Sequence, residues 1–245
     1  MSHPAPSPDP SPPPAHLTPR IVTWRHAFAW YEDAMRLFKF APLTFIGLAL
    51  VTIATELSLK AAPGALALTG EIFTPLVACG LVYAAAAADR REAPSMRLAV
   101  LVFRAGGSVI ATIVGASLVT FAAQALAGWW IADANLLLPE GAMQLSLPAV
   151  LGIYAIGTLA ALPVTFVPLL ALFERVPLRA AFVASGIAFA QNTVPLLIYG
   201  AASLALLCFG LLTAGFGLAL ALPLWTAATY AAWKDVYGVR DAPTF

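Results

Sequence analysis

Residues 193–233 contain no charged side chain, and this run constrains the fold more than any other feature of the sequence. A transmembrane helix needs roughly 20 apolar residues to cross a hydrocarbon core of about 30 Å. The run is therefore long enough for two crossings, and the glycines at 210, 215 and 217 provide a turn where it would divide. Only 10% of the chain is charged, against roughly 25% in a soluble domain. We therefore expect an all-α integral membrane protein.

The remaining apolar runs extend this prediction to six transmembrane helices. They are placed near 42–59, 67–88, 108–132, 148–173, 193–212 and 216–233. Residues 20–240 are predicted to form a single membrane domain, followed by a short tail, 241–245. The preceding tail, 1–19, holds eight prolines and is expected to be disordered or to form polyproline II. It lacks the apolar region that follows the basic start of a signal peptide.

The basic residues predict the orientation of these helices. With six spans, every basic residue except Lys60 falls on one side of the membrane. Cytoplasmic loops carry the excess of Lys and Arg, so both termini are expected in the cytoplasm. Arg outnumbers Lys and Ala is abundant, which is typical of a GC-rich bacterial genome, so the expected location is the bacterial inner membrane.

The chain also shows three copies of one pattern, namely an amphipathic segment, an outward helix and a return helix that contains proline. The amphipathic segments begin near Arg25, Ser95 and Leu178. The clearest match aligns residues 161–175 with residues 221–235 without gaps. The first amphipathic segment has Trp24, Ala27, Phe28, Tyr31, Met35 and Phe38 on one predicted helical face. We therefore predict that it lies in the headgroup plane.

Two groups of charges near the span ends are candidate sites, because ionisable residues inside membranes are often functional. The first is a polar site of Glu56, Lys60 and Glu71 near the outer ends of the first two spans. It suits either an outward-facing acidic site for a cation or proton, or an ion network that pins the hairpin. The second is a cytoplasmic charge ring, which would suit a gate, a docking surface or ordinary topology-setting charge. Its members are Asp89, Arg90, Glu174, Arg175, Lys234 and Asp235.

Enzymatic function is not expected. All three histidines, His3, His16 and His26, precede the first predicted span, so none can act as an intramembrane base or metal ligand. The sequence has no HExxH, GxSxG, Walker or GxGxxG motif. We therefore predict no catalytic residue, no cofactor and no metal site. A net charge of +1 gives no reason to expect nucleic acid as a partner.

The opening HAFAWYEDAMRLFKFAPLTFIGLAL and the close LPLWTAATYAAWKDVYG resemble an uncharacterised proteobacterial family of six-helix integral membrane proteins. The pattern is similar to YciC-like proteins and to the membrane domain of some glycerophosphodiester phosphodiesterases. The resemblance covers about residues 20–240. It implies an inner-membrane location and brings no assigned activity and no catalytic residue.

Two classes of function follow from these observations. The first is a non-enzymatic membrane component that organises or regulates a membrane protein partner through its cytoplasmic helices. The second is a small-solute transporter or channel, which the intramembrane prolines, Glu56 and Glu71 motivate. The sequence favours the first, because no charged residue is placed near the bilayer midplane. The lipid bilayer is the one partner that either class requires, and the oligomeric state is left open.

Cysteine accessibility tests the predicted topology. In a chain lacking Cys79 and Cys208, single cysteines at Ala62 and Ala214 should react with an impermeant thiol reagent added outside. Cysteines at Ser95 and Thr244 should react only after the membrane is permeabilised. Outside labelling at Ser95 or Thr244 would contradict six spans with both ends in the cytoplasm.

Overall fold

The computed structural model describes residues 18–62, 68–137 and 145–245, and every regular element in these ranges is helical. Pro63-Gly64, a dipeptide typical of turns that separates the first two predicted spans, and most of the proline-rich tail lie outside the described residues. Five helices are long and apolar enough to cross a membrane, which marks a multi-pass membrane protein. They are α2 (Pro42–Lys60), α3 (Gly70–Asp89), α4 (Gly107–Ala132), the broken helix Leu147–Glu174, and α9 (Thr193–Leu212).

The last helix, α10 (Leu218–Tyr237), is twenty residues long but is not one of these five. Its second half contains threonines, aromatic residues and the Lys234-Asp235 pair, which lower its mean hydropathy. A sixth crossing therefore stays a prediction.

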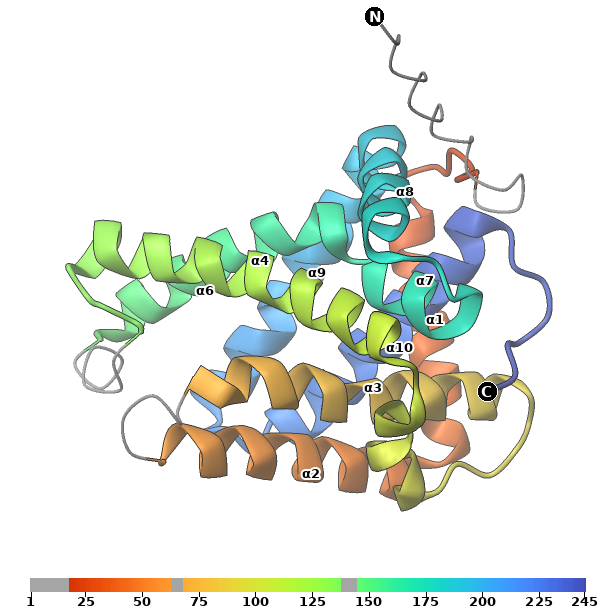
Figure 1. Ribbon diagram of the computed structural model, residues 1–245, viewed down its shortest axis with the longest axis horizontal. Coiled ribbons are helices and arrows are strands. Elements are labelled where there is room, and N and C mark those ends of the chain that lie inside the picture. The colour runs from red at the N-terminus through yellow and green to blue at the C-terminus, as the bar shows by residue number, and fades with distance from the viewer. Residues whose placement is uncertain (1–17, 63–67, 138–144) are drawn as a thin grey trace, which may run out of the picture.

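A shorter helix precedes each pair of long helices. α1 (His26–Phe40) comes before α2, η3 (Met96–Arg104) before α4, and α8 (Leu178–Gln191) before α9. The order agrees with the predicted threefold pattern, but η3 is a 3-10 helix and the repeat itself stays a prediction. In Figure 1, α2, α3 and α4 run alongside one another while α1 crosses one end of them. We call this the α1 end, and the end with the C-terminus of α2 the opposite end.

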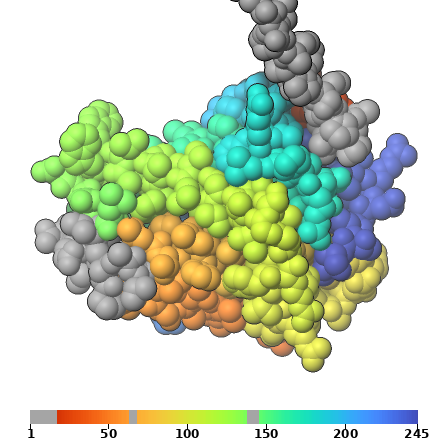
Figure 2. All heavy atoms as spheres, viewed as in Figure 1, coloured from red at the N-terminus to blue at the C-terminus, as the bar shows by residue number. Residues whose placement is uncertain are grey.

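Helix α3 is the centre of the packing. It contacts α1, α2, α4, α10 and η3, and all its residues from Cys79 to Ala88 are buried. Most of these side chains are small, which lets neighbouring backbones approach closely. The closest approach is at Gly80, where an added Cβ would lie 2.8 Å from the Cα of Ala99 in η3. Figure 2 shows η3 and α4 covering this face of the molecule.

The return helices meet in an aromatic cluster that we define as Tyr83, Phe173, Tyr230 and Trp233. Phe173 lies at its centre, with ring centroids 5.3 Å from Trp233, 6.1 Å from Tyr83 and 6.2 Å from Tyr230. Phe173 belongs to α7 (Val167–Glu174), so the cluster joins α3, α7 and α10 near the α1 end. Phe173 and Trp233 are also the residues that the sequence alignment of the second and third copies places opposite each other.

The apolar face predicted for α1 is divided in the structure. Ala27 is buried on the bundle, and the buried set otherwise consists of residues outside the predicted face: Trp30, Ala34 and Leu37. In contrast, Trp24, Phe28 and Met35 are exposed. Apolar residues occur around most of this helix, so one stripe packs mainly against α10 while the other stays available to lipid. A pattern of one face per helix could not distinguish the two stripes.

We expect Gly80→Ala to destabilise the fold, because its methyl group would collide with the backbone of η3. Overpacking of this kind costs about 1–3 kcal/mol. Thermal unfolding in detergent should show a lower midpoint for this variant. Gly186→Ala in α8 is the matched control, since an added Cβ there meets nothing within 4 Å. Equal midpoints for the two variants would contradict the close packing of η3 on α3.

Candidate functional site

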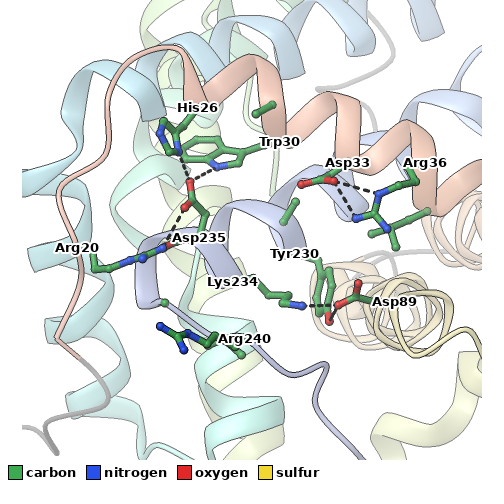
Figure 3. Close-up of a pocket in the computed structure, with 15 residues that line it drawn as sticks. Arg20, His26, Trp30, Asp33, Arg36, Asp89, Tyr230, Lys234, Asp235 and Arg240 are labelled. Carbon is green, nitrogen blue, oxygen red and sulfur yellow. Dashed lines mark hydrogen bonds and ion pairs between the residues drawn. The ribbon is translucent and has the colours of Figure 1, made fainter.

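A charged pocket of about 410 Å³ lies between α1, α3 and α10 at the α1 end (Figure 3). Its charged and titratable lining residues define what we call the α1-end cluster. They are Arg20, His26, Asp33, Arg36, Asp89, Lys234, Asp235 and Arg240. The cluster therefore joins residues from both ends of the chain.

Asp235 contacts three other side chains around this pocket. Its carboxylate lies 2.6 Å from Nδ1 of His26, accepts a 2.9 Å bond from Nε1 of Trp30 and pairs with Arg20 at 3.1 Å. Arg20 also donates to the backbone carbonyl of Asp235 at 3.1 Å through Nε. Trp30 is almost fully buried, so its indole N–H needs this acceptor. Asp235 thus fastens α1 and the segment before it to the end of α10.

A second acid joins α3 to α10 in the same pocket. Lys234 Nζ lies 2.5 Å from Oδ2 of Asp89, and the hydroxyl of Tyr230 donates to that oxygen at 3.0 Å. The side chains of Lys234 and Asp89 are only 20% and 14% exposed. A charge pair this sheltered from water loses little to screening. It therefore acts as a structural tie between two long helices.

The structure assembles only part of the predicted charge ring. Asp89, Lys234 and Asp235 meet in the pocket, whereas Arg90 turns to Glu92 at 2.9 Å and packs over the ring of Phe245. The hydrogen bond from Arg90 lowers the pKa of Glu92 below its usual value. Glu174 and Arg175 end α7 and do not line this pocket.

The three residues of the polar site predicted at the opposite end lie close enough to interact electrostatically. Glu56 pairs with Lys60 at 2.6 Å and accepts a 2.6 Å hydrogen bond from the hydroxyl of Thr74. These contacts tie α2 to α3. Glu71, the third member of the predicted site, interacts electrostatically with Lys60 and Glu56 without a close ion pair, and it also lines a cavity between the long helices.

This central cavity has a volume of about 340 Å³ and is walled by α3, α4, the broken helix, α9 and α10. Most of its wall is apolar. The polar side chains that line it come from five different elements. They are Glu71, Ser117, Thr120, Gln124, Thr165, Tyr199, Trp225, Thr226 and Thr229.

Most of these polar groups are already paired with the protein. The hydroxyls of Ser117, Thr165 and Thr226 donate to backbone carbonyls at 2.8–2.9 Å. The hydroxyl of Tyr199 accepts from Trp225 Nε1 at 2.7 Å and lies 2.6 Å from that of Thr229.

The Glu71 carboxylate and the Gln124 carboxamide differ from the rest of the lining. No hydrogen bond joins either group to another side chain or backbone group in the ranges that the structure describes. Both groups are therefore free to bind something that enters the cavity.

The break in the fourth long helix faces the same cavity. α6 (Leu147–Ala161) passes through the 3-10 turn η4 (Leu162–Val164) and resumes as α7. Pro163 and Pro168 cannot donate the backbone bonds that a continuous helix needs. The freed N–H of Phe166 instead donates to the buried hydroxyl of Ser185 on α8 at 3.2 Å. A neighbouring helix thus satisfies one backbone group at the break, as irregular backbone within a membrane requires.

Tyr31 connects α1 to the wall of the cavity. Its ring stacks on Tyr199 with centroids 5.9 Å apart, and its hydroxyl contacts Ser203 at 2.8 Å and the Tyr199 carbonyl at 3.1 Å. Burial raises the pKa of Tyr31 well above its usual value, so the hydroxyl stays neutral and able to donate. A movement of α1 would therefore also move the side chain of Tyr199 in the cavity wall.

No family model, curated protein or solved structure matches this chain. The resemblance to YciC-like proteins therefore stays a prediction. Sequence reasoning identified Glu71 but missed Tyr199, Trp225 and Thr229. The available signal was the polar spacing of Trp225, Thr226 and Thr229 in α10, in an otherwise apolar run.

We expect Asp235→Ala to loosen α1, because it removes the acceptor of three side chains at once. Hydrogen bonds to a charged group contribute about 1.5–3 kcal/mol each, so amide hydrogen exchange should accelerate across residues 26–40. Asp33→Ala is the control, since it removes only the exposed pair with Arg36 within α1. Equal exchange in the two variants would show that Asp235 does not hold α1.

Proposed function

We propose that this protein is a small-solute transporter whose binding site is the central cavity. The observation that carries the proposal is the pair of unpaired polar groups, Glu71 and Gln124, in a mostly apolar cavity among the long helices. Both side chains are only partly buried, so a solute in the cavity can reach them. Ionisable residues in or near membrane spans are typical of substrate and ion pathways.

The broken helix supports the same proposal. Transporter sites are typically formed where transmembrane helices are discontinuous near the bilayer midplane. Ala161, Val164, Thr165 and Pro168 all line the central cavity, and they flank or form the break between α6 and α7. A helix broken beside a cavity can change its local angle with little loss of hydrogen bonding, which suits alternating access.

The alternative, a component that organises or regulates a membrane protein partner, gains less support from the geometry. Asp89, Lys234 and Asp235 were candidates for a docking surface, but their charges pair within the protein. The exposed apolar residues of the amphipathic helices, such as Phe28 on α1 and Val183 on α8, suit contact with lipid. The sequence alone favoured the component that organises a partner, whereas the cavity favours the transporter.

The transport proposal includes a topology of six spans with both termini in the cytoplasm of a bacterial cell. Support comes from the contact of Arg20 with Asp235, which brings the start and the end of the membrane domain to one end of the bundle. A chain whose ends meet on one side has crossed the membrane an even number of times. The basic residues gathered toward that end favour the cytoplasmic side.

Flux measurements with a matched pair of variants test the transport proposal. Proteoliposomes containing the protein should take up at least one solute from a broad labelled panel faster than empty liposomes. Ala78→Phe fills the cavity from α3 and should reduce that uptake to the empty-liposome rate. Ala122→Phe adds the same group at an exposed position of α4 and should leave uptake unchanged.

Two results would refute the proposal. One is uptake no faster than in empty liposomes for every solute in the panel. The other is equal uptake by the wild type and a correctly folded Ala78→Phe variant, because the solute would then take another route.

A further inference from the structure

We propose that the central cavity selects amphipathic cations, in which a single ammonium group is attached to an apolar body. The inference rests on the proposed function and specifies its substrate class. It follows from three properties of the site. They are the negative charge of Glu71 at the edge of the cavity nearest the opposite end, the mostly apolar lining, and the space around Gln124.

The charge balance at the opposite end leaves Glu71 without an ion pair of its own among the described residues. Glu56, Glu71 and Asp133 are the acids there among the described residues, and Lys60 is the one base. Lys60 acts on Glu71 electrostatically, but it lies 2.6 Å from Glu56 and is held in that pair. An ionised Glu71 therefore leaves a net negative charge at this edge of the cavity, which a bound cation can balance. A field of this sign also raises the local concentration of cations.

The wall of the cavity favours an organic cation over a metal ion. Calcium takes six to eight oxygen ligands and magnesium requires an octahedral set, whereas here the oxygen groups not already hydrogen-bonded within the protein are one carboxylate and one carboxamide. Groups of three or more metal-binding side chains are absent from the described ranges. Apolar side chains cannot replace the hydration shell of a metal ion, but Val82, Ile113, Phe121 and Trp225 can cover a hydrocarbon or aromatic body.

Gln124 provides a second contact for an ammonium group. A Cβ at residue 157 would lie 2.5 Å from Cγ of Gln124 and 2.6 Å from its Nε2, so the glycine leaves the room in which this side chain lies. The carboxamide oxygen can accept from an ammonium group, which has three donors. An anion would be repelled by Glu71, and a neutral solute would leave its carboxylate unpaired.

Three probes that share a phenylethyl group isolate the effect of charge. Phenethylamine is a cation at neutral pH, phenethyl alcohol is neutral, and hydrocinnamate is an anion. Equilibrium binding to the full chain in nanodiscs should be tightest for phenethylamine and weakest for hydrocinnamate. Glu71→Gln should weaken phenethylamine binding roughly tenfold or more, because a hydrogen-bonded charge is lost. Binding of the alcohol should hardly change.

Two further variants make the result independent of folding. Glu71→Asp keeps the charge and should retain the preference for phenethylamine over the alcohol. Ala78→Phe should abolish binding of both probes, which shows that they occupy the central cavity.

Several outcomes would overturn the inference. Binding of phenethylamine no tighter than that of the alcohol would do so, as would a Glu71→Gln variant with unchanged preference. If Ala78→Phe still abolished alcohol binding, the cavity would remain a solute site and only the cation class would fail. Absence of binding by all three probes would also overturn the inference, while the flux panel decides the transport proposal separately.

Discussion

The close approach of neighbouring elements to α3 is the constraint on which the rest of the structure depends. Lipid tails are as apolar as the side chains, so membrane helices associate through van der Waals packing and polar contacts rather than the hydrophobic effect. The small side chains between Cys79 and Ala88 permit such packing on several sides of α3 at once. The same helix then carries Glu71 at one end, lines the cavity at Pro75 and Cys79, and ends at Asp89.

The charged contacts divide into two functional types. At the α1 end, Asp89 and Asp235 each bind several partners and hold helices together. At the opposite end, Glu56 forms an ion pair with Lys60, whereas Glu71 lines the cavity without a close ion pair. Two acids only fifteen residues apart therefore differ in role because one has a neighbour of opposite charge on its own helix. Tyr31 then links the two ends, since it belongs to α1 and packs on Tyr199 in the cavity wall.

The sequence was sufficient to predict the features that depend on composition and on the length of apolar runs. Apolar length predicted the all-helical membrane class, and helices occur at each of the predicted apolar runs. The alanine run 84–88 shows why the packing could not be predicted, because such a run is apolar whether it faces lipid or protein. The break after Ala161 could not be predicted either, because it depends on the hydroxyl of Ser185 on another helix accepting a hydrogen bond from the N–H of Phe166. Nor could spacing show that Lys234 would reach Asp89, which lies 145 residues earlier.

The tie between Arg20 and Asp235 also has a consequence for how the chain is made. Its two residues are separated by 215 positions, and ribosomes add about 5–20 residues per second. The first helix therefore leaves the ribosome roughly 10–40 s before its main packing partner, α10, exists. During that interval Trp30 and His26 have no acceptor from Asp235, and the stripe of α1 that packs against α10 lacks its main partner. A nascent chain truncated before α10 would therefore leave uncovered a stripe of α1 that is buried in the complete fold.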